Sequence, residues 1–356
     1  MASNKTNTGN YFEDFKIGQI LNHATPRTIT EGDVSLYTAL YGGRFALQSA
    51  DSFAIDCGLQ AAPVDDLLVF HIVFGKTVPD VSLNAVANLG YADVRFVAPV
   101  YPGDTVQTSS EVIGLKQNSN GKTGVVYVRS TGVNQMGEVV LDYVRWVMVR
   151  KNNLDAPAPE TVIPELPAVV DPVNFVMPPD LQIQQFDTTL SGSPHMYEDY
   201  EIGEKIDHID GMTIEESEHM LATRLYQNTA KVHFNQYMMK DDRMGRRLIY
   251  GGHIISLARG LSFNGLGNSL FVAAINGGSH TAPTFAGNTV FAWSEVLDKS
   301  DIPGREDIGA LRIRTLATKD TPCTDFPDKS EDGSRNPNVV LDLDYWLILP
   351  KATVAL

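Results

Sequence analysis

The sequence predicts an α+β fold made of two similar repeats, each an antiparallel sheet wrapped around a long buried helix. Within its 356 residues, the stretch from Phe12 to Gln48 recurs from Tyr197 to His233, an offset of 185, with 12 identities over 37 positions. In each half an apolar stretch follows that is hydrophobic on every side, as a fully buried helix is. Strand-like runs separated by turn residues then complete each half.

The same elements are expected in the same order in both repeats. An extended segment leads into a helix, and the runs Thr28 to Glu31 and Thr213 to Glu216 fit a capping box, in which a threonine accepts a backbone N–H and a glutamate reaches back. The two apolar stretches, Leu67 to Phe74 and Ile254 to Leu261, are predicted as the central helices.

Strands are expected to follow each central helix. In the first half they are predicted at Asp93 to Val97, Val106 to Leu115, Val125 to Arg129 and Val139 to Val149. Asn118 to Gly121 and Asn134 to Gly137, between them, have the composition of hairpin turns. In the second half the segment from Thr318 to Asn338 is rich in turn formers, and we predict a long surface loop there.

A proline-rich connection separates the repeats. Eight of the 19 prolines lie from Pro157 to Pro194, and proline neither continues a helix nor donates to a sheet. Apolar residues within this segment predict that it crosses the surface in contact with the protein. We therefore divide the chain into a first repeat (1–151), a crossover (152–194) and a second repeat (195–356).

Composition excludes several classes of function. The net charge of −15 argues against nucleic-acid binding, which needs a basic surface. Cys57 and Cys323 are too few for a disulfide framework, so a reducing cytoplasm is expected. The polar N-terminus lacks the apolar region of a signal peptide, and no apolar run is long enough to span a membrane.

The stretch from Tyr226 to His233 is the best candidate for chemistry. An imidazole at His233 can take and give a proton near pH 7, and Asn228 stands five residues before it. The corresponding residues of the first repeat are Gln48 and Gly43. Only the second repeat is therefore expected to transfer protons.

This run resembles the site of the MaoC-type, (R)-specific enoyl-CoA hydratases of the hotdog superfamily. The family pattern is aromatic–Ala–x–Leu–Ser–Gly–Asp–x–Asn–Pro–Leu–His, followed by Ile–x–x–Gly–Met; the matching runs here are Leu225 to His233 and Ile249 to Gly252. The resemblance covers residues 11 to 350. It implies a double hotdog fold and reversible syn hydration of an α,β-unsaturated acyl-CoA. Coenzyme A is then part of the substrate, and no cofactor is implied.

The resemblance also implies three catalytic residues. His233 would be the general acid and base, and the backbone N–H of Gly252 would hold the negative charge that develops on the thioester oxygen. Asn228 replaces the family's aspartate, and because an amide cannot transfer a proton it would only orient water. The proton for the α-carbon would then come from His233 or from a bound water.

Further residues are candidates for substrate binding. They are Gly251, Tyr226, Lys231, Arg44, Gln48, Arg247 and His253, with His280 as a possible lining residue. A substrate carboxylate or a coenzyme A phosphate needs a cation, for which the arginines and the lysine of this set are candidates; the alternative is that they are simply solvated. The emptied first repeat is expected to widen the pocket for a branched acyl group.

Other histidines have simpler interpretations. His23 and His208 recur at equivalent positions, which favours a structural role, and the histidines lack the paired spacing of a metal site. A homodimer is expected, because hotdog sheets pair readily. Three alternatives stay open: a hydratase for a straight-chain acyl-CoA, a non-catalytic acyl-CoA-binding protein, and, more weakly, a thioesterase.

Overall fold

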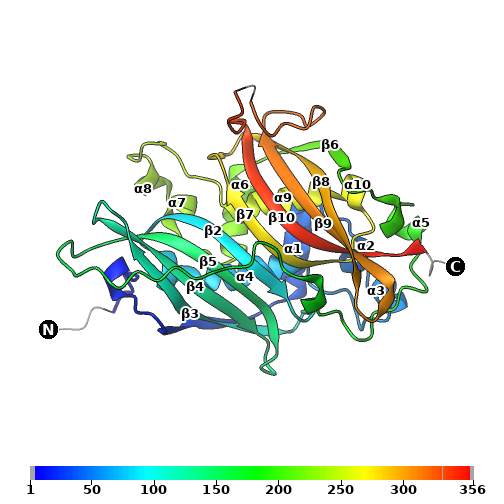
Figure 1. Ribbon diagram of the computed structural model, residues 1–356, viewed down its shortest axis with the longest axis horizontal. Helices are drawn as coiled ribbons and strands as arrows, with labels where there is room; N and C mark the ends of the chain where they lie inside the picture. The colour runs from blue at the N-terminus through cyan, green and yellow to red at the C-terminus, as the bar shows by residue number, and fades with distance from the viewer. Residues whose placement is uncertain (1–4, 331, 353–356) are drawn as a thin grey trace.

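The computed structural model describes residues 5–330 and 332–352. Within them, ten strands form one sheet in the order β1-β3-β4-β5-β2-β7-β10-β9-β8-β6, and the two repeats lie side by side (Figure 1). The first repeat supplies β1 (Ile20–Thr28), β2 (Ala85–Phe96), β3 (Thr105–Gln117), β4 (Thr123–Val133) and β5 (Val139–Arg150). The second supplies β6 (Lys205–Thr213), β7 (Phe271–His280), β8 (Thr289–Ile302), β9 (Arg305–Lys319) and β10 (Val339–Pro350).

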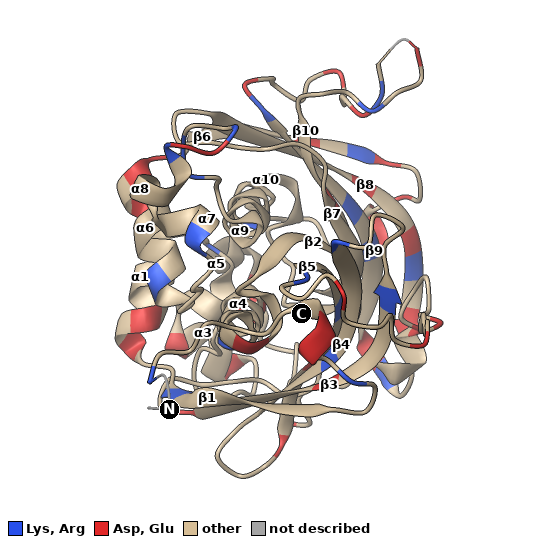
Figure 2. Cartoon of the chain, turned by 90° about the vertical axis from the view of Figure 1, so that its left-hand side faces the viewer, with Lys and Arg blue, Asp and Glu red and all other residues tan. Residues whose placement is uncertain are grey.

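The helices lie inside the curve of this sheet or at its open side (Figure 2). The first repeat contains α1 (Glu31–Tyr41), α2 (Ala46–Ser49), α3 (Asp51–Asp56) and α4 (Asp66–Thr77), and the crossover contains α5 (Thr188–Ser191). The second contains α6 (Glu216–Leu225), α7 (Lys231–Phe234), α8 (Gln236–Met239), α9 (Gly251–Leu261) and α10 (Phe263–Leu266). Four single turns complete the set: η1 (Phe12–Asp14), η2 (Val78–Ser82), η3 (Pro172–Asn174) and η4 (Tyr197–Asp199).

The two central helices, α4 and α9, are confirmed, and they run antiparallel to each other. His71 in the middle of α4 is hydrogen-bonded to Ser256 in the middle of α9, at 2.9 Å between Nε2 and Oγ. Near the end of α4, the Phe74 ring lies 6.1 Å from the ring of Tyr250, which precedes α9. The N-terminus of each helix therefore lies beside the C-terminal half of the other.

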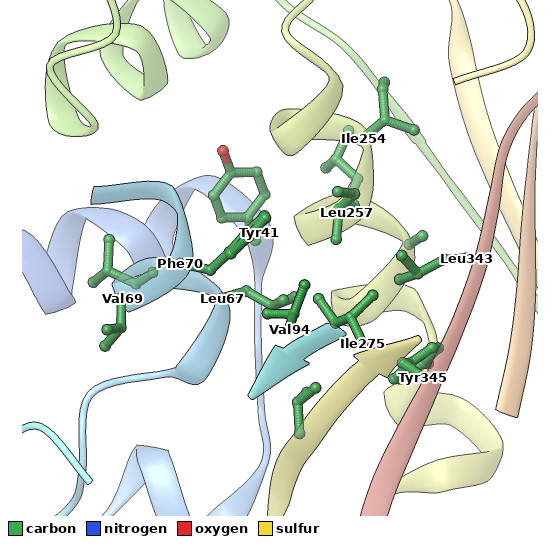
Figure 3. Close-up of a cluster of buried hydrophobic side chains, with 14 of the residues drawn as sticks. Tyr41, Leu67, Val69, Phe70, Val94, Ile254, Leu257, Ile275, Leu343 and Tyr345 are labelled. Atoms are coloured by element: carbon green, nitrogen blue, oxygen red, sulfur yellow. The ribbon is translucent and has the colours of Figure 1, made fainter. Parts of the chain in front are cut away.

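Burial explains why α4 is apolar on every side. All of its residues from Leu67 to Thr77 are buried. In Figure 3, Phe70 of α4 and Leu257 of α9 lie in one apolar cluster with Val94 and Ile275 of the strands β2 and β7. These two strands pair antiparallel, so the sheets of the two repeats merge as expected.

A matched pair of glycines fixes each repeat on the other. A side chain at Gly75 of α4 would overlap the backbone carbonyl of Tyr226, and one at Gly260 of α9 would overlap that of Tyr41. Both pairs are related by the offset of 185 found in the sequence. Each central helix therefore supports the loop that follows the first helix of the opposite repeat.

The predicted capping boxes are wrong. Helix α1 is capped two residues later, by Thr30, and α6 follows Glu215 without a side-chain cap. Thr28 and Thr213 instead end strands, where their hydroxyls bond to threonines of β3 and β8. Strand pairing outweighs the local capping pattern at these positions.

Strand β2 begins at Ala85, eight residues earlier than predicted, because pairing with β5 extends a segment of weak strand propensity.

The crossover and the long loop agree with expectation. Residues such as Ile183 and Phe186 of the crossover are buried in a cluster with Trp346 of β10, so the segment is packed along the surface. The loop after β9 contains only an isolated bridge between Lys329 and Arg335 among its described residues. The limits of the repeats at 151 and 195 stay a prediction.

Candidate active site

His233 lies on α7, beside the N-terminus of α9. Its Nδ1 is 2.9 Å from the carbonyl oxygen of Leu248, and its ring lies 5.4 Å from that of Tyr250, the residue preceding α9. Because a carbonyl can only accept, Nδ1 carries the hydrogen and Nε2 keeps a lone pair. Burial lowers the pKa of His233 to about 4. At neutral pH the imidazole is therefore neutral, with Nε2 available as a base.

Asn228 is held by its own loop. Its Oδ1 accepts a hydrogen bond from the backbone N–H of Ala230 at 3.0 Å, which fixes the orientation of the amide. The side chain is buried, and Nδ2 has no acceptor within the described ranges. This nitrogen can donate a hydrogen bond to a water oxygen but cannot transfer a proton.

The N-terminus of α9 presents free backbone donors. Tyr250 at the N-cap provides no side-chain cap, so the N–H groups of the first turn, including those of Gly251 and Gly252, keep the partial positive charge of a helix N-terminus. A side chain at Gly252 would overlap the rings of Tyr250 and His71. Glycine is needed here because aromatic rings approach the backbone closely. These N–H groups can stabilise an oxyanion.

The sequence did not identify His219, which positions this helix start. The backbone N–H of Tyr250 donates to His219 Nε2 at 2.8 Å, and the His219 ring stands at 90° to that of His233, 6.2 Å away. Burial first, and then His253 and His233, lower the pKa of His219 to about 2. This neutral imidazole ties the start of α9 to helix α6. The repeat offset of 185 places His219 opposite Val34 of the first repeat. This change from an apolar residue to a histidine is the sequence signal that could have identified His219.

His280 also belongs to this site. It is the last residue of β7, and its imidazole stands where a side chain at Gly251 would lie. The residue is exposed to solvent, and partial loss of hydration, followed by His233, lowers its pKa to about 4. The structure therefore brings a third imidazole to the N-terminus of α9.

Two predicted binding residues lie in the core instead. The hydroxyl of Tyr226 donates to that of Tyr41 at 2.6 Å, and the Tyr41 hydroxyl is 2.9 Å from Nδ1 of His253. All three side chains are buried. Tyr226 and His253 thus form a hydrogen-bonded link between the repeats directly beneath the site.

The first repeat contains the counterpart of this site in altered form. A small cavity there is lined by residues that correspond, at the offset of 185, to those around His233. They are Val34, Gly43, Gln48, Asp65 and Leu68, the counterparts of His219, Asn228, His233, Tyr250 and His253. The Gln48 amide donates to the carbonyl of Leu270 at 2.6 Å. The Asp65 carboxylate accepts from the N–H of Leu67 at 2.9 Å, which is the counterpart of the free Gly252 N–H.

The expectation that the emptied first repeat widens the catalytic pocket is wrong. Gln48 contacts Leu270, and the Arg44 guanidinium lies 4.6 Å from the ring centroid of Phe263, so both residues sit beyond the C-terminus of α9. His233 lies at the N-terminus, about 16 Å away along the 11 residues of the helix. The two-fold relation of the repeats places the two sites at opposite ends, and the structure does not bring Arg44 and Gln48 to His233.

The other two predicted cations are nearer. Lys231 is the first residue of α7 and is exposed; α7 carries a blue segment in Figure 2. Arg247 Nη2 is 2.8 Å from Glu216 Oε2, so its charge is already paired. Lys231 is thus the cation of this pair that is open to an anionic ligand.

The described part of the chain contains no candidate metal site and no candidate membrane span. In residues 5–330 and 332–352, no group of three or more histidine, cysteine, aspartate or glutamate side chains could hold a metal ion. No helix of the described chain has the length and apolarity needed to cross a membrane. His23 and His208 each bond through Nε2 to a serine, at 2.8 Å, and both are buried, which supports a structural role.

Four buried neutral histidines predict acid-sensitive folding. Burial lowers the pKa of His71, His208, His219 and His253 to between about 2 and about 4. The unfolded chain takes up these protons as the pH falls below about 6.5, whereas the folded chain does not. Stability is therefore lost on acidification, by up to about 1.4 kcal/mol per pH unit from each residue. Asp66 opposes this loss, because burial raises its pKa to about 8 and the folded chain keeps its proton. Urea unfolding at pH 8, 7, 6 and 5 should therefore show a steep fall only below pH 6, where the four histidines outweigh Asp66; a flat profile would contradict this.

Comparison with known proteins adds to this geometry. The sequence model of the mesaconyl-CoA hydratase family matches residues 2–325. The chain is 64% identical to the β-methylmalyl-CoA dehydratase of Chloroflexus aurantiacus, over 98% of this chain and 99% of that one. It is 58% identical to the mesaconyl-CoA hydratase of Cereibacter sphaeroides, over 98% of this chain and all of that one (100%).

Solved structures are similar over nearly the whole chain. A crystal structure of a putative MaoC domain protein dehydratase from Chloroflexus aurantiacus superposes with a TM-score of 0.96, at 64% identity over 98% of this chain and 99% of that one. A Mycobacterium tuberculosis protein described as a double hotdog has a TM-score of 0.73 at 24% identity, over 97% of this chain and 99% of its own. The double hotdog prediction is confirmed.

Proposed function

The chain belongs to the mesaconyl-CoA hydratase family, and on that premise we propose that it reversibly hydrates mesaconyl-CoA to β-methylmalyl-CoA. The observation that carries the proposal is the pairing of a neutral His233, whose Nε2 is a free base, with the uncapped N-terminus of α9. A hydratase needs both a base for water and a donor for the thioester oxygen. The first repeat has neither, since Gln48 cannot act as a base and Asp65 occupies the corresponding N–H.

The reaction adds one water across the double bond. His233 Nε2 takes a proton as the water oxygen bonds to the β-carbon, and the π electrons move toward the thioester oxygen. The Gly252 N–H stabilises the enolate charge there. A proton then goes to the α-carbon from the imidazolium of His233 or from a bound water, and the thioester carbonyl reforms. Dehydration follows the same steps in reverse.

Known magnitudes are sufficient for this chemistry. A positioned general acid–base contributes roughly 10²–10⁴-fold and one oxyanion donor roughly 10²–10³-fold. Asn228 would hold the water oxygen through Nδ2 while Ala230 holds its Oδ1. Where the imidazolium of His233 supplies the α-proton directly, a single imidazole performs both proton transfers, as syn addition allows.

Absorbance of the enoyl thioester tests the proposal. Purified protein is expected to bleach the absorbance of mesaconyl-CoA, and more efficiently than that of crotonyl-CoA, which lacks the methyl branch and the second carboxylate. No change with either thioester would reject a hydratase. Turnover of crotonyl-CoA alone would reject the branched substrate.

We further propose that the chain acts as a homodimer in the cytoplasm. Strands β1 and β6 are the two edges of the sheet, and the unpaired backbone groups of an edge strand can pair with another chain. Both cysteines are free and buried, which suits a reducing compartment. Light scattering in solution gives the mass directly; the mass of one chain would reject the dimer.

A further inference from the structure

Arg145 of β5 is a buried cation without a counter-ion. Its side chain is 0% exposed, and Nη2 bonds only to hydroxyls, those of Thr77 at 2.6 Å and Ser82 at 3.3 Å. No carboxylate of the described residues lies within ion-pair distance, and Nε has no partner. Burial lowers the pKa of Arg145, an effect that the phenols of Tyr143 and Tyr250 oppose. A buried charge is strongly unfavourable unless something pairs with it.

Two buried phenols lie on the same face of the sheet. Tyr91 and Arg145 are register partners on β2 and β5, so their side chains share a face, and Tyr143 follows the same alternation. The Tyr91 hydroxyl is buried and has no hydrogen-bond partner, and the buried Tyr143 hydroxyl makes no hydrogen bond of normal geometry, although the Ser130 and Thr77 side chains lie near it. Three adjacent residues therefore present donors that make no hydrogen bond of normal geometry within the described chain. Such a group of donors fits an anion.

These donors lie at the catalytic end of the molecule. The Arg145 guanidinium lies 4.3 Å from the ring centroid of Phe74, which is itself 6.1 Å from the ring of Tyr250 at the start of α9. On the other side, the Tyr91 ring is 6.3 Å from that of His280, whose imidazole covers Gly251. The donors are therefore flanked by the residues that surround the free N–H groups of α9.

The opposite end of the molecule provides a natural comparison. Arg259 is also buried and also bonds to two serines, Ser262 and Ser269. There, however, Tyr345 and then Asp65 and Asp66 counter the lowering of its pKa by burial, although no carboxylate of the described residues lies within ion-pair distance of Arg259 either. The buried cation at the altered end thus has two acidic residues nearby, whereas only phenols counter the burial of the one at the catalytic end.

We propose that Arg145, with the hydroxyls of Tyr91 and Tyr143, binds the free carboxylate of the substrate. This subsite selects monothioesters of unsaturated dicarboxylic acids over simple enoyl thioesters, and it rests on the proposed hydratase function. In mesaconyl-CoA the free carboxylate is attached to the β-carbon. Pairing this carboxylate with Arg145 holds the acyl group in place. It also offsets the negative charge of the carboxylate, which would otherwise oppose attack by water on the β-carbon.

The test compares two substrates in the same protein. Arg145→Met replaces the cation with an apolar side chain of similar length, which a buried site often tolerates. We expect the ratio of kcat/KM for mesaconyl-CoA to that for crotonyl-CoA to fall at least ~100-fold, because the carboxylate loses a buried charged partner. The ratio does not depend on how much protein is folded. A ratio within about three-fold of wild type would overturn the proposal.

Controls separate this proposal from the hydratase function. Wild-type protein that hydrates neither thioester rejects the function itself, whereas wild-type turnover with an unchanged ratio in the variant rejects only the subsite. Arg259→Met is the matched buried arginine and should leave the ratio unchanged; an equal fall there would also count against Arg145. If Arg145→Met does not fold, Tyr143→Phe decides: a rise in KM for mesaconyl-CoA but not for crotonyl-CoA supports the subsite, and equal KM values reject it.

Discussion

His233→Gln is expected to lower kcat for mesaconyl-CoA hydration at least ~10³-fold without unfolding the protein. The amide can still donate to the Leu248 carbonyl that now accepts from Nδ1 of His233, so the loop keeps its hydrogen bond. It cannot take a proton from water at any pH near neutrality. The measurement is the initial rate of enoyl thioester bleaching, with circular dichroism as the check on folding.

The first repeat provides the matched control. Gln48 is the counterpart of His233, and Gln48→Ala should keep kcat within about three-fold of wild type, since that site holds no group able to transfer a proton. Near-normal turnover by His233→Gln would remove it from the mechanism. Abolished turnover by Gln48→Ala would show that the first site takes part.

Gly75→Ala is expected to lower the free energy of unfolding by about 2–4 kcal/mol and to reduce kcat of the folded fraction at least ~10-fold. The added methyl group would overlap the carbonyl of Tyr226, so the loop that carries Asn228 must move away from α4. A misplacement of that size in a catalytic loop is costly because the reacting atoms must keep their positions.

Gly260→Ala is the control for this prediction. It places the same methyl group against the Tyr41 carbonyl and should cost similar stability. Because it disturbs the first-repeat loop, the folded fraction should keep its kcat. Urea unfolding and rates corrected for folded protein check both variants; equal losses of kcat would contradict an assignment of chemistry to the second repeat.

The repeat made much of this molecule predictable. Identities at a constant offset revealed the duplication, and two stretches apolar on every side indicated the central helices α4 and α9. The continuous sheet was expected because the two similar repeats pair with each other. Element boundaries were less predictable, because the strand ends at Thr28 and Thr213 depend on partners in β3 and β8 that are distant in sequence.

The site was only partly predictable for a geometrical reason. His233 and Gly252 could be recognised from a local run, but His219 and His280 come from α6 and β7 and meet the site only after folding. Arg145 lies about 90 residues before His233 in sequence, and nothing local marks it as unpaired. The sequence also could not show that the antiparallel central helices put the two sites at opposite ends.

The central claim is that only the site of the second repeat, at His233, binds substrate, and that the corresponding site of the first repeat, at Gln48, does not. Titration calorimetry with methylsuccinyl-CoA, the saturated counterpart of mesaconyl-CoA, tests this claim most directly. The compound keeps both the thioester and the carboxylate but cannot be hydrated. We predict one binding site per chain. In the first repeat the Asp65 carboxylate already accepts from the Leu67 N–H, and the Gln48 amide already donates to the Leu270 carbonyl. Two equal sites per chain would show that the first repeat binds substrate as well.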